Sequence, residues 1–252
     1  MMLYQAVVLA LVQGFTEFLP VSSSGHLLMA RLLLHVPESN GQTFDAFLHL
    51  GTLGAVLIYY WRTWLHLTRE LAVKLVIATI PGALAGYFLQ DSVERYMRGP
   101  HLLALSFLAT ALILWWFDRL PEPAQSKSKE TLSRMDAFII GFWQIIALVP
   151  AISRSGTTIA AGRARGLGRR EATEWSFLMS APIIAGASLA SLLKLLQSGG
   201  FSGELLAVGT LVSFASGLAS IYLLMRLIQR ISFKPFVIYL IGLAIVIWIM
   251  AR

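Results

Sequence analysis

The stretch Gln13-Gly-Phe-Thr-Glu-Phe-Leu-Pro-Val-Ser-Ser-Ser-Gly-His26 decides the fold that this sequence predicts. An apolar run that begins at Met2 leads directly into it, yet the stretch contains a carboxylate, an imidazole, three serines and a helix-breaking proline. In a water-soluble protein this mixture would form an ordinary turn. Inside a membrane each of these polar groups is costly to bury, so there they would indicate function. Whether the chain lies in a membrane therefore decides how the stretch is interpreted.

The composition is that of a membrane protein. Hydrophobic residues make up 57% of the 252 and charged residues only 13%, whereas soluble domains contain roughly a quarter charged residues. The mean hydropathy is +0.71. Long apolar runs recur, most of them close to the roughly 20 residues with which a helix crosses the hydrocarbon core. They are Met2–Leu19, Phe44–Trp61, Leu71–Leu89, Leu102–Phe117, Ala137–Ile152, Ser176–Leu196, Leu205–Leu224 and Phe236–Met250. We therefore predict an all-α polytopic membrane protein.

Charge and cysteine content narrow the function further. The net charge of +7 is explained by loops that Lys and Arg hold at the cytoplasmic face, so we expect no nucleic-acid partner. The chain has no cysteine, which excludes disulfides and thiolate catalysis. It also has no glycine-rich loop ending in Gly-Lys-Ser/Thr, which argues against nucleotide hydrolysis of the P-loop kind.

The sequence predicts two weakly similar halves within one integral membrane domain. A hydrophilic stretch separates a first repeat (residues 1–118) from a second repeat (137–252), and we interpret residues 119–136 as a cytoplasmic linker. Gly14-Phe15…Pro20…Ser24-Gly25 is echoed by Gly141-Phe142…Pro150…Ser155-Gly156. Duplication at half-chain length is common in transporter-like membrane folds.

Counting the Lys and Arg residues predicts how the runs cross the membrane. If all the runs cross in alternation, these residues (Arg154 left out) divide 9 against 10 between the two sides. If Met2–Leu19 and Ala137–Ile152 instead turn back at Pro20–Gly25 and Pro150–Gly156, they divide 5 against 14. The second division is what the positive-inside rule expects. It predicts an inverted repeat of six transmembrane helices plus two re-entrant helical hairpins that meet near the midplane, with both termini outward.

The first turn carries groups suited to phosphate chemistry. Gln13 and Glu17 lie four residues apart and share a helix face. Ser22, Ser23 and Ser24 precede the apolar segment Leu27–Leu34 as N-cap residues would, and a helix N-terminus binds anions. His26 lies close to the same point. Capping alone is the plainer interpretation of the serines, and the adjacent acid and imidazole are what favour function.

The second turn adds a permanent cation. Arg154 has no acid near it in sequence, and its planar guanidinium matches phosphate oxygens. The alternative is a structural pair with Glu17. Ser153 and Ser155 are expected to cap the segment Thr157–Ala164, which creates a second anion site facing the first.

Together these groups form a set suited to phosphoryl transfer: an acid, an imidazole, hydroxyls, an Arg and two helix N-termini. Glu17 with Gln13 could also hold a hydrated divalent cation across phosphate oxygens. Asp45 and His49 share a helix face at the start of another run, where they either extend this polar network or mark a helix interface.

Both motifs resemble those of one family. Gln13 to His26 resembles the Glu/Gln-x-x-x-Glu motif, with its Pro-Val-Ser-Ser-x-Gly-His extension, of the bacterial undecaprenyl-diphosphate phosphatases, also called bacitracin-resistance proteins. Pro150-Ala-Ile-Ser-Arg-Ser-Gly-Thr-Thr158 resembles the family's second motif, Pro-Gly-x-x-Arg-Ser-x-x-Thr. The resemblance covers nearly the whole chain.

The resemblance implies hydrolysis of undecaprenyl diphosphate, the lipid on which bacitracin acts, at the outer face of the bacterial inner membrane. It implies a divalent cation, Mg²⁺ or Ca²⁺, and a functional set that carries over onto Glu17, Ser23, His26, Arg154, Ser153 and Thr158. Two positions depart from the family pattern. Gln13 replaces a common Glu, and Ala151 replaces the motif's Gly, so we expect no glycine-only conformation there.

Three questions stay open on the sequence. The nucleophile is Ser23 with His26 as base, or His26 itself, or water activated by His26. The chain is a monomer or a homodimer. The main alternative function is a transporter that moves undecaprenyl phosphate or a related anionic lipid, because inverted repeats around a midplane cavity suit that role equally.

Overall fold

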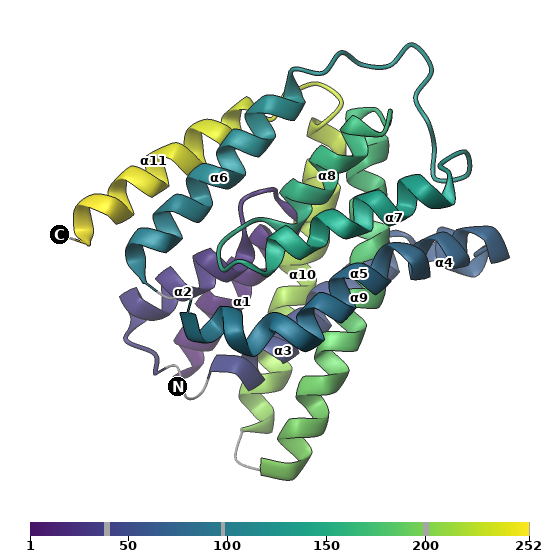
Figure 1. The fold of residues 1–252 in the computed structure, drawn as a ribbon. Coiled ribbons are helices and arrows are strands. Elements are labelled where there is room, and N and C mark those ends of the chain that lie inside the picture. The colour runs from purple at the N-terminus through teal and green to yellow at the C-terminus, as the bar shows by residue number, and fades with distance from the viewer. Residues whose placement is uncertain (38–40, 97–98, 199–201, 252) are drawn as a thin grey trace.

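The computed structural model describes residues 1–37, 41–96, 99–198 and 202–251, and these form helices joined by short turns and one long linker (Figure 1). The helices are α1 (Leu3–Phe18), α2 (Ser23–Leu34), α3 (Gly41–Tyr59), α4 (Trp61–Leu65), α5 (Arg69–Tyr96), α6 (Pro100–Asp118), α7 (Arg134–Phe142), the 3₁₀ helix η2 (Trp143–Leu148), α8 (Arg154–Ala164), α9 (Arg169–Ser198), α10 (Gly203–Leu227) and α11 (Lys234–Met250).

The prediction of a helical membrane protein is confirmed. Among the described residues, four helical segments are long and apolar enough to cross a membrane: Arg69–Leu89, Pro100–Asp118, Arg169–Leu192 and Gly203–Leu227. Three shorter apolar helices accompany them: Leu3–Phe18, Phe44–Tyr59 and Lys234–Met250. The apolar run 137–152 differs from the others, because it is divided between α7 and a tighter 3₁₀ helix.

Proline ends the helix before each polar turn. Helical backbone is disfavoured in the residue that precedes a proline. Leu19, before Pro20, and Val149, before Pro150, are accordingly extended (ψ 143° and 123°). Each turn then contains a non-glycine residue with positive φ, Ser22 in the first and Ala151 in the second.

The expectation for Ala151 is therefore wrong. Its φ is +66°, in the left-handed region that glycine adopts most readily. An L-residue with a Cβ pays roughly 1–2 kcal/mol to adopt this conformation. Ala151 is buried at the contact between the two turns, so its methyl group gains packing that offsets this strain.

The helices after the turns begin earlier than expected. Ser22 is the N-cap of α2, and Ser23 and Ser24 already lie in its first turn. Ser153 is the N-cap of α8, which begins at Arg154 rather than at residue 157. Ser155 is not a cap, because it lies inside the helix and its hydroxyl bonds elsewhere. The earlier start places the Arg154 side chain in the first turn of α8.

Two glycines let helices from opposite halves of the chain approach closely. α1 packs against α10, and α7 packs against α5. A Cβ at Gly14 would lie 1.9 Å from Ser216 Oγ of α10, and one at Gly141 would lie 2.1 Å from the Ala78 carbonyl oxygen of α5. Because backbone cannot move aside as a flexible side chain does, only glycine fits at Gly141.

Replacing Gly141 by Ala is expected to lower the free energy of unfolding by about 3 kcal/mol or more, since the methyl group overpacks against the backbone of α5. Gly242→Ala in α11 is the matched control. A Cβ there meets no atom within 4 Å, so it should be neutral or slightly stabilising. Denaturation of both variants in detergent measures the difference. Equal stability would show that α5 and α7 do not approach as described.

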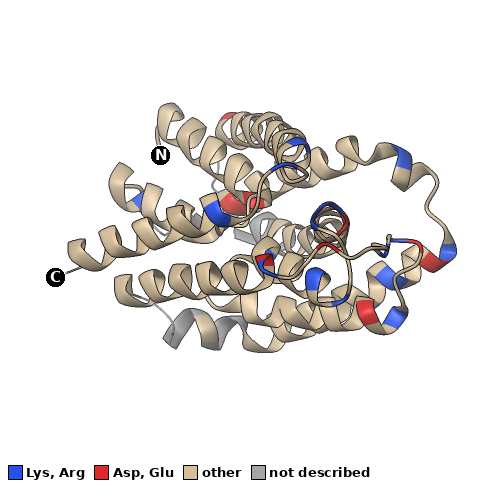
Figure 2. Ribbon diagram, turned by 90° about the horizontal axis from the view of Figure 1, so that it is seen from above, with Lys and Arg blue, Asp and Glu red and all other residues tan. Residues whose placement is uncertain are grey.

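The linker between the halves is held by ion pairs. Asp136 accepts hydrogen bonds from Lys127 Nζ (2.8 Å) and Arg165 Nε (2.7 Å). The buried Arg163 side chain pairs with Glu122 (3.0 Å) and also donates to the Leu120 carbonyl. Figure 2 shows both termini at one end of the molecule and most of the charged residues toward the other. The linker is therefore fastened to the C-terminal end of α8.

Asp136 should contribute stability that depends on pH. Burial raises the pKa of its carboxyl group, but hydrogen bonds from Lys127, Arg165 and Ser133 outweigh burial and hold the pKa well below its ordinary value. A depressed pKa stabilises the fold above the ordinary pKa of about 4 and less as the pH falls below it. We expect Asp136→Asn to cost about 1–3 kcal/mol at neutral pH. In denaturation experiments, this gap should shrink below about pH 4, and a gap independent of pH would contradict the assignment.

Candidate active site

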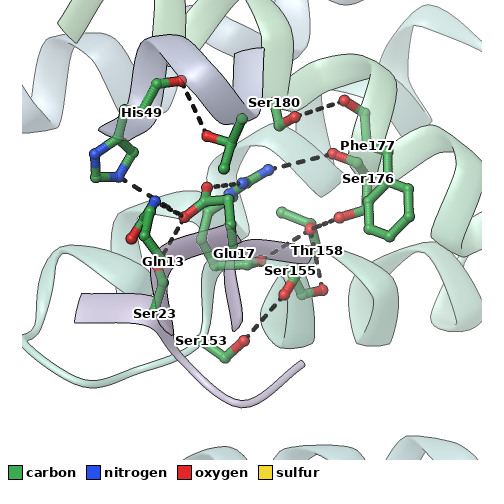
Figure 3. A network of polar contacts seen from close by, with 12 residues as sticks. Gln13, Glu17, Ser23, His49, Ser153, Ser155, Thr158, Ser176, Phe177 and Ser180 are labelled. Atoms are coloured by element: carbon green, nitrogen blue, oxygen red, sulfur yellow. Dashed lines mark hydrogen bonds and ion pairs between the residues drawn. The ribbon is translucent and has the colours of Figure 1, made fainter. Parts of the chain in front are cut away.

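A buried carboxylate lies where the two polar turns meet (Figure 3). The Glu17 side chain is 7% exposed, and its Oε1 accepts a hydrogen bond from Arg154 Nη2 (2.6 Å). Its Oε2 accepts from Ser23 Oγ (2.7 Å) and from Gln13 Nε2 (2.9 Å). His49 Nε2 lies 3.7 Å from the same Oε2. The structure thus brings Arg154, which is 137 residues away in the chain, to Gln13, Glu17 and Ser23 of the first polar turn.

Local structure explains how these side chains reach one point. Gln13 and Glu17 lie one turn apart at the C-terminal end of α1. Ser23 is the first residue of α2 and Arg154 the first residue of α8, so two helix N-termini lie beside the carboxylate. The free N–H groups and partial positive charge of a helix N-terminus favour an anion.

Arg154 forms the pair with Glu17 that the sequence left as the structural alternative. The pair uses Nη2, while Nη1 donates to the Ser176 carbonyl oxygen at 3.4 Å. A guanidinium group has five N–H donors, and the side chain is 18% exposed. Arg154 can therefore bind phosphate oxygens through its remaining donors while Glu17 keeps it oriented. Pairing and function are compatible.

The two turns are also fastened directly to each other. Ser155 Oγ donates to the Leu19 carbonyl oxygen (2.9 Å), which links α8 to the end of α1. Gly25 packs against the other turn, because a Cβ there would lie 2.9 Å from Ala151 Cβ. The backbone N–H of Ser153 donates to Thr110 Oγ1 of α6 (3.1 Å). These contacts hold the two helix N-termini at a fixed separation.

The remaining predicted hydroxyls have structural partners. Ser153 Oγ caps the Gly156 N–H (3.0 Å), and Thr158 Oγ1 bonds to the Arg154 carbonyl (2.9 Å) and Ser176 Oγ (2.7 Å). Both side chains thus shape the start of α8. In the first turn Ser22 Oγ, 3.3 Å from Ser24 Oγ, caps the Gly25 N–H, and Ser24 is exposed. Ser24 is therefore the hydroxyl freest to meet a ligand.

His26 points toward different helices from those that hold Glu17. Its Nδ1 lies 2.7 Å from the Ser22 carbonyl oxygen and its Nε2 lies 2.7 Å from Tyr239 Oη of α11. In this structure the Ser23 hydroxyl donates to Glu17, so the pairing of Ser23 with His26 considered from the sequence is not formed. His26 lies one turn from Ser22 in the same helix, facing α6 and α11.

His49 belongs to the polar network around Glu17, which is one of the two roles that the sequence leaves open for it. Its Nδ1 donates to the Asp45 carbonyl oxygen (2.7 Å), which directs Nε2 toward Glu17. Asp45 pairs with Arg31 of α2 instead. The available signal was an ionisable residue inside an apolar run, which is rare without a function. Spacing alone did not reveal which neighbour it meets.

Gln13 and Glu17 offer a partial fit to a divalent cation. Gln13 Nε2 donates to Glu17, and its Oε1 is buried without a hydrogen-bond partner among the described residues. An amide oxygen and a carboxylate are ligands that Mg²⁺ and Ca²⁺ accept, with phosphate oxygens and waters completing the shell. The described residues contain no cluster of three or more His, Cys, Asp or Glu that could hold a metal unaided. A cation would thus have to be shared with a phosphate ligand.

The fold and the site together define a polytopic helical membrane protein in which a buried acid lies beside a half-buried hydroxyl and a half-buried guanidinium group, an arrangement suited to an anionic phosphate. The chain belongs to the family described as Bacitracin resistance protein BacA, whose sequence model matches residues 6–246.

Relatives in several bacteria are named undecaprenyl-diphosphatase. The one from Desulforudis audaxviator is 40% identical over 262 residues, covering 99% of this chain and 98% of the relative. The one from Ruegeria pomeroyi is 39% identical and covers 98% of each chain. The one from Chromohalobacter salexigens is 36% identical and covers 96% of this chain and 97% of its own. The resemblance read from the two motifs is confirmed.

Proposed function

We infer that this chain is a membrane-embedded phosphatase that hydrolyses undecaprenyl diphosphate to undecaprenyl phosphate and inorganic phosphate. The observation that carries the inference is the contact of Ser23 and Arg154 with Glu17, which joins a hydroxyl, a cation and a base at two helix N-termini. Family membership over nearly the whole chain supports the same substrate. The reaction regenerates the lipid carrier of peptidoglycan synthesis and consumes the lipid that bacitracin binds, which accounts for resistance.

Binding of the diphosphate follows from charge. Arg154 supplies a fixed cation, and the first N–H groups of α2 and α8 supply donors that need no reorganisation. Ser24, exposed at the same helix end, adds a hydroxyl. Ser22, Ser153, Ser155 and Thr158 act on substrate binding indirectly, because their hydroxyls hold the helix starts and the two turns together.

The chemistry proceeds in two displacements. Ser23 Oγ attacks the terminal phosphorus, Glu17 takes the hydroxyl proton, and the bond to the bridging oxygen breaks to release undecaprenyl phosphate. Water then attacks the phosphoserine, a water proton passes to His26, and Ser23 recovers its proton from Glu17 as phosphate leaves. Glu17 suits the first step because it already accepts the hydrogen bond of Ser23 at 2.7 Å.

A divalent cation, Mg²⁺ or Ca²⁺, would be held by Glu17 and the unpartnered Gln13 Oε1 together with the substrate. When bound, it would neutralise charge that develops on the phosphate oxygens. Chelation should therefore abolish phosphate release, and added Mg²⁺ should restore it. Full activity in the presence of a chelator would show that the reaction needs no divalent cation.

The arrangement of contacts supports an inverted repeat, residues 1–118 and 137–252 joined by the linker 119–136. α1 packs on α10 and α7 packs on α5, while α3 packs on α10 and α9 packs on α5. If each helix is replaced by its counterpart in the other half (α1 by α7, α3 by α9 and α10 by α5), the first contact of each pair becomes the second. α3 also packs on α9, and α6 packs on α11. In each of these contacts the two helices hold equivalent positions in the two halves. This pattern fits six transmembrane helices and two re-entrant hairpins in the bacterial inner membrane. The termini and the site entrance then face the periplasm, and the linker faces the cytoplasm.

The comparisons do not favour the transporter alternative. Phosphate release from undecaprenyl diphosphate by purified protein in detergent tests the proposed function, because detergent leaves no membrane to cross. We expect multiple turnovers. Lipid binding without phosphate release would instead identify a transporter.

A further inference from the structure

Both ring nitrogens of His26 are occupied. Nδ1 lies 2.7 Å from the Ser22 carbonyl oxygen, and Nε2 lies 2.7 Å from Tyr239 Oη. The Tyr239 ring stacks on the imidazole, with centroids 5.7 Å apart and planes inclined by 13°. Phe107 of α6 meets the imidazole edge-on, with centroids 5.5 Å apart. The ring is therefore held on three sides by different elements.

These contacts fix where the His26 proton lies. A carbonyl oxygen only accepts hydrogen bonds, so Nδ1 carries the proton and donates it to Ser22. In the neutral ring Nε2 is then the acceptor, and the Tyr239 hydroxyl donates to it. This resembles the order of groups in a hydrolase triad, in which a hydroxyl donates to Nε2 and an acceptor orients Nδ1–H.

Packing alone does not require the tyrosine hydroxyl. Phenylalanine would supply the same stacked ring, and α11 otherwise packs mainly against α6. Tyr239 is 48% exposed on an apolar helix, where a hydroxyl without a partner is costly. Its hydroxyl lies beside Nε2 of His26, the ring nitrogen that carries no proton.

We propose that Tyr239 and His26 act as one acid–base unit, in which the Tyr239 hydroxyl carries protons to and from Nε2. The proposal rests on the proposed function. Because no ring nitrogen is free, a proton reaches His26 through this hydroxyl. In the second displacement the Tyr239 oxygen takes a proton from the attacking water and passes its own proton to Nε2. The water oxygen bonds to phosphorus, the bond to Ser23 breaks, and Ser23 recovers its proton from Glu17.

The test compares Tyr239→Phe, His26→Asn and the double variant with wild-type protein. Tyr239→Phe keeps the stacked ring, so the thermal midpoint should stay unchanged. We expect kcat to fall about a hundredfold with little change in KM, as for loss of a general acid–base group. The double variant should lose no more than His26→Asn alone. Tyr222→Phe in α10, which removes a similarly exposed hydroxyl (Tyr222 is 54% exposed), should match wild type.

Wild-type kcat in Tyr239→Phe, an increase caused by freeing Nε2, or losses that multiply in the double variant would each overturn the proposal. A second readout does not need turnover. Histidine-selective ¹⁵N NMR of the five histidines, with His26 assigned from His26→Asn, should show the Nδ1–H tautomer and a shift of Nε2 in Tyr239→Phe. An Nε2–H tautomer in the wild type would contradict the pair. Absence of phosphate release by wild type would instead count against the proposed function.

Discussion

Arg154→Ala is expected to lower kcat/KM for undecaprenyl diphosphate by about a thousandfold, the upper range for loss of one preorganised group that stabilises transition-state charge. Arg154 is the cation that contacts the Glu17 carboxylate, and it begins the helix α8, whose N-terminus lies beside that carboxylate. Arg154→Lys keeps the charge but loses the planar pair of donors, so its activity should lie between those of Ala and wild type.

The matched control for this prediction is Arg119→Ala. Arg119 is also a cation of the chain, but its guanidinium group lies 3.4 Å over the Trp115 ring rather than in the site. We expect the kcat/KM of Arg119→Ala to stay within a factor of about two of the wild-type value. Substitutions of exposed charged residues away from a functional contact usually have small effects. Near-normal phosphate release by Arg154→Ala would contradict the assignment of this residue to the substrate phosphates.

Ser23→Ala should abolish the covalent route, and we expect kcat to fall by about 10⁴-fold or more, as when a hydrolase loses its nucleophile. Glu17→Gln should cause a loss of similar size, because the amide cannot take the Ser23 proton. Combining the two should cost no more than either alone, since residues that act as a unit are not additive.

Ser188→Ala is the control for loss of a buried hydroxyl. Its Oγ bonds to the Ala46 carbonyl of α3, away from the carboxylate, so it should leave kcat close to wild type. If Ser23→Ala turned over at a wild-type rate while Glu17→Gln was inactive, Glu17 would act on water and Ser23 would serve only to orient it.

The sequence predicts the two turns well because their determinants are local. Pro20 and Pro150 end the preceding helices at Leu19 and Val149 independently of how the rest of the chain packs. The sequence offers the pairing of Glu17 with Arg154 only as the alternative to phosphate binding by Arg154, because an ionised group at membrane depth needs a partner of either kind. The contact is found at 2.6 Å.

The direction of His26 could not be predicted. Residues three positions apart in a helix lie only about 60° apart around its axis, yet Ser23 contacts Glu17 whereas His26 contacts Tyr239. Which neighbour each meets depends on helices far along the chain, and the Tyr239 contact spans 213 residues. The position of His49 beside Glu17 has the same cause, because it depends on how α3 packs against α1.

Ala151 shows a limit of a different kind. The absence of glycine predicts that the turn needs no glycine-only conformation at this position, yet the turn holds an alanine at φ +66°, where glycine is favoured. Strained backbone persists where the surroundings fix it. Here the Gly25 contact and the hydrogen bond from Ser153 to Thr110 supply that constraint. The residue type of one position does not reveal such tertiary support.

The central claim is that Ser23, oriented by Glu17, attacks a phosphorus held by Arg154. Rapid acid quenching of wild-type protein with substrate labelled in the terminal phosphate, followed by peptide mapping, tests it most directly. We predict a transient label on Ser23 that appears before phosphate release and is absent from Ser23→Ala. A label on His26, or full turnover with no labelled residue at any time, would contradict the claim.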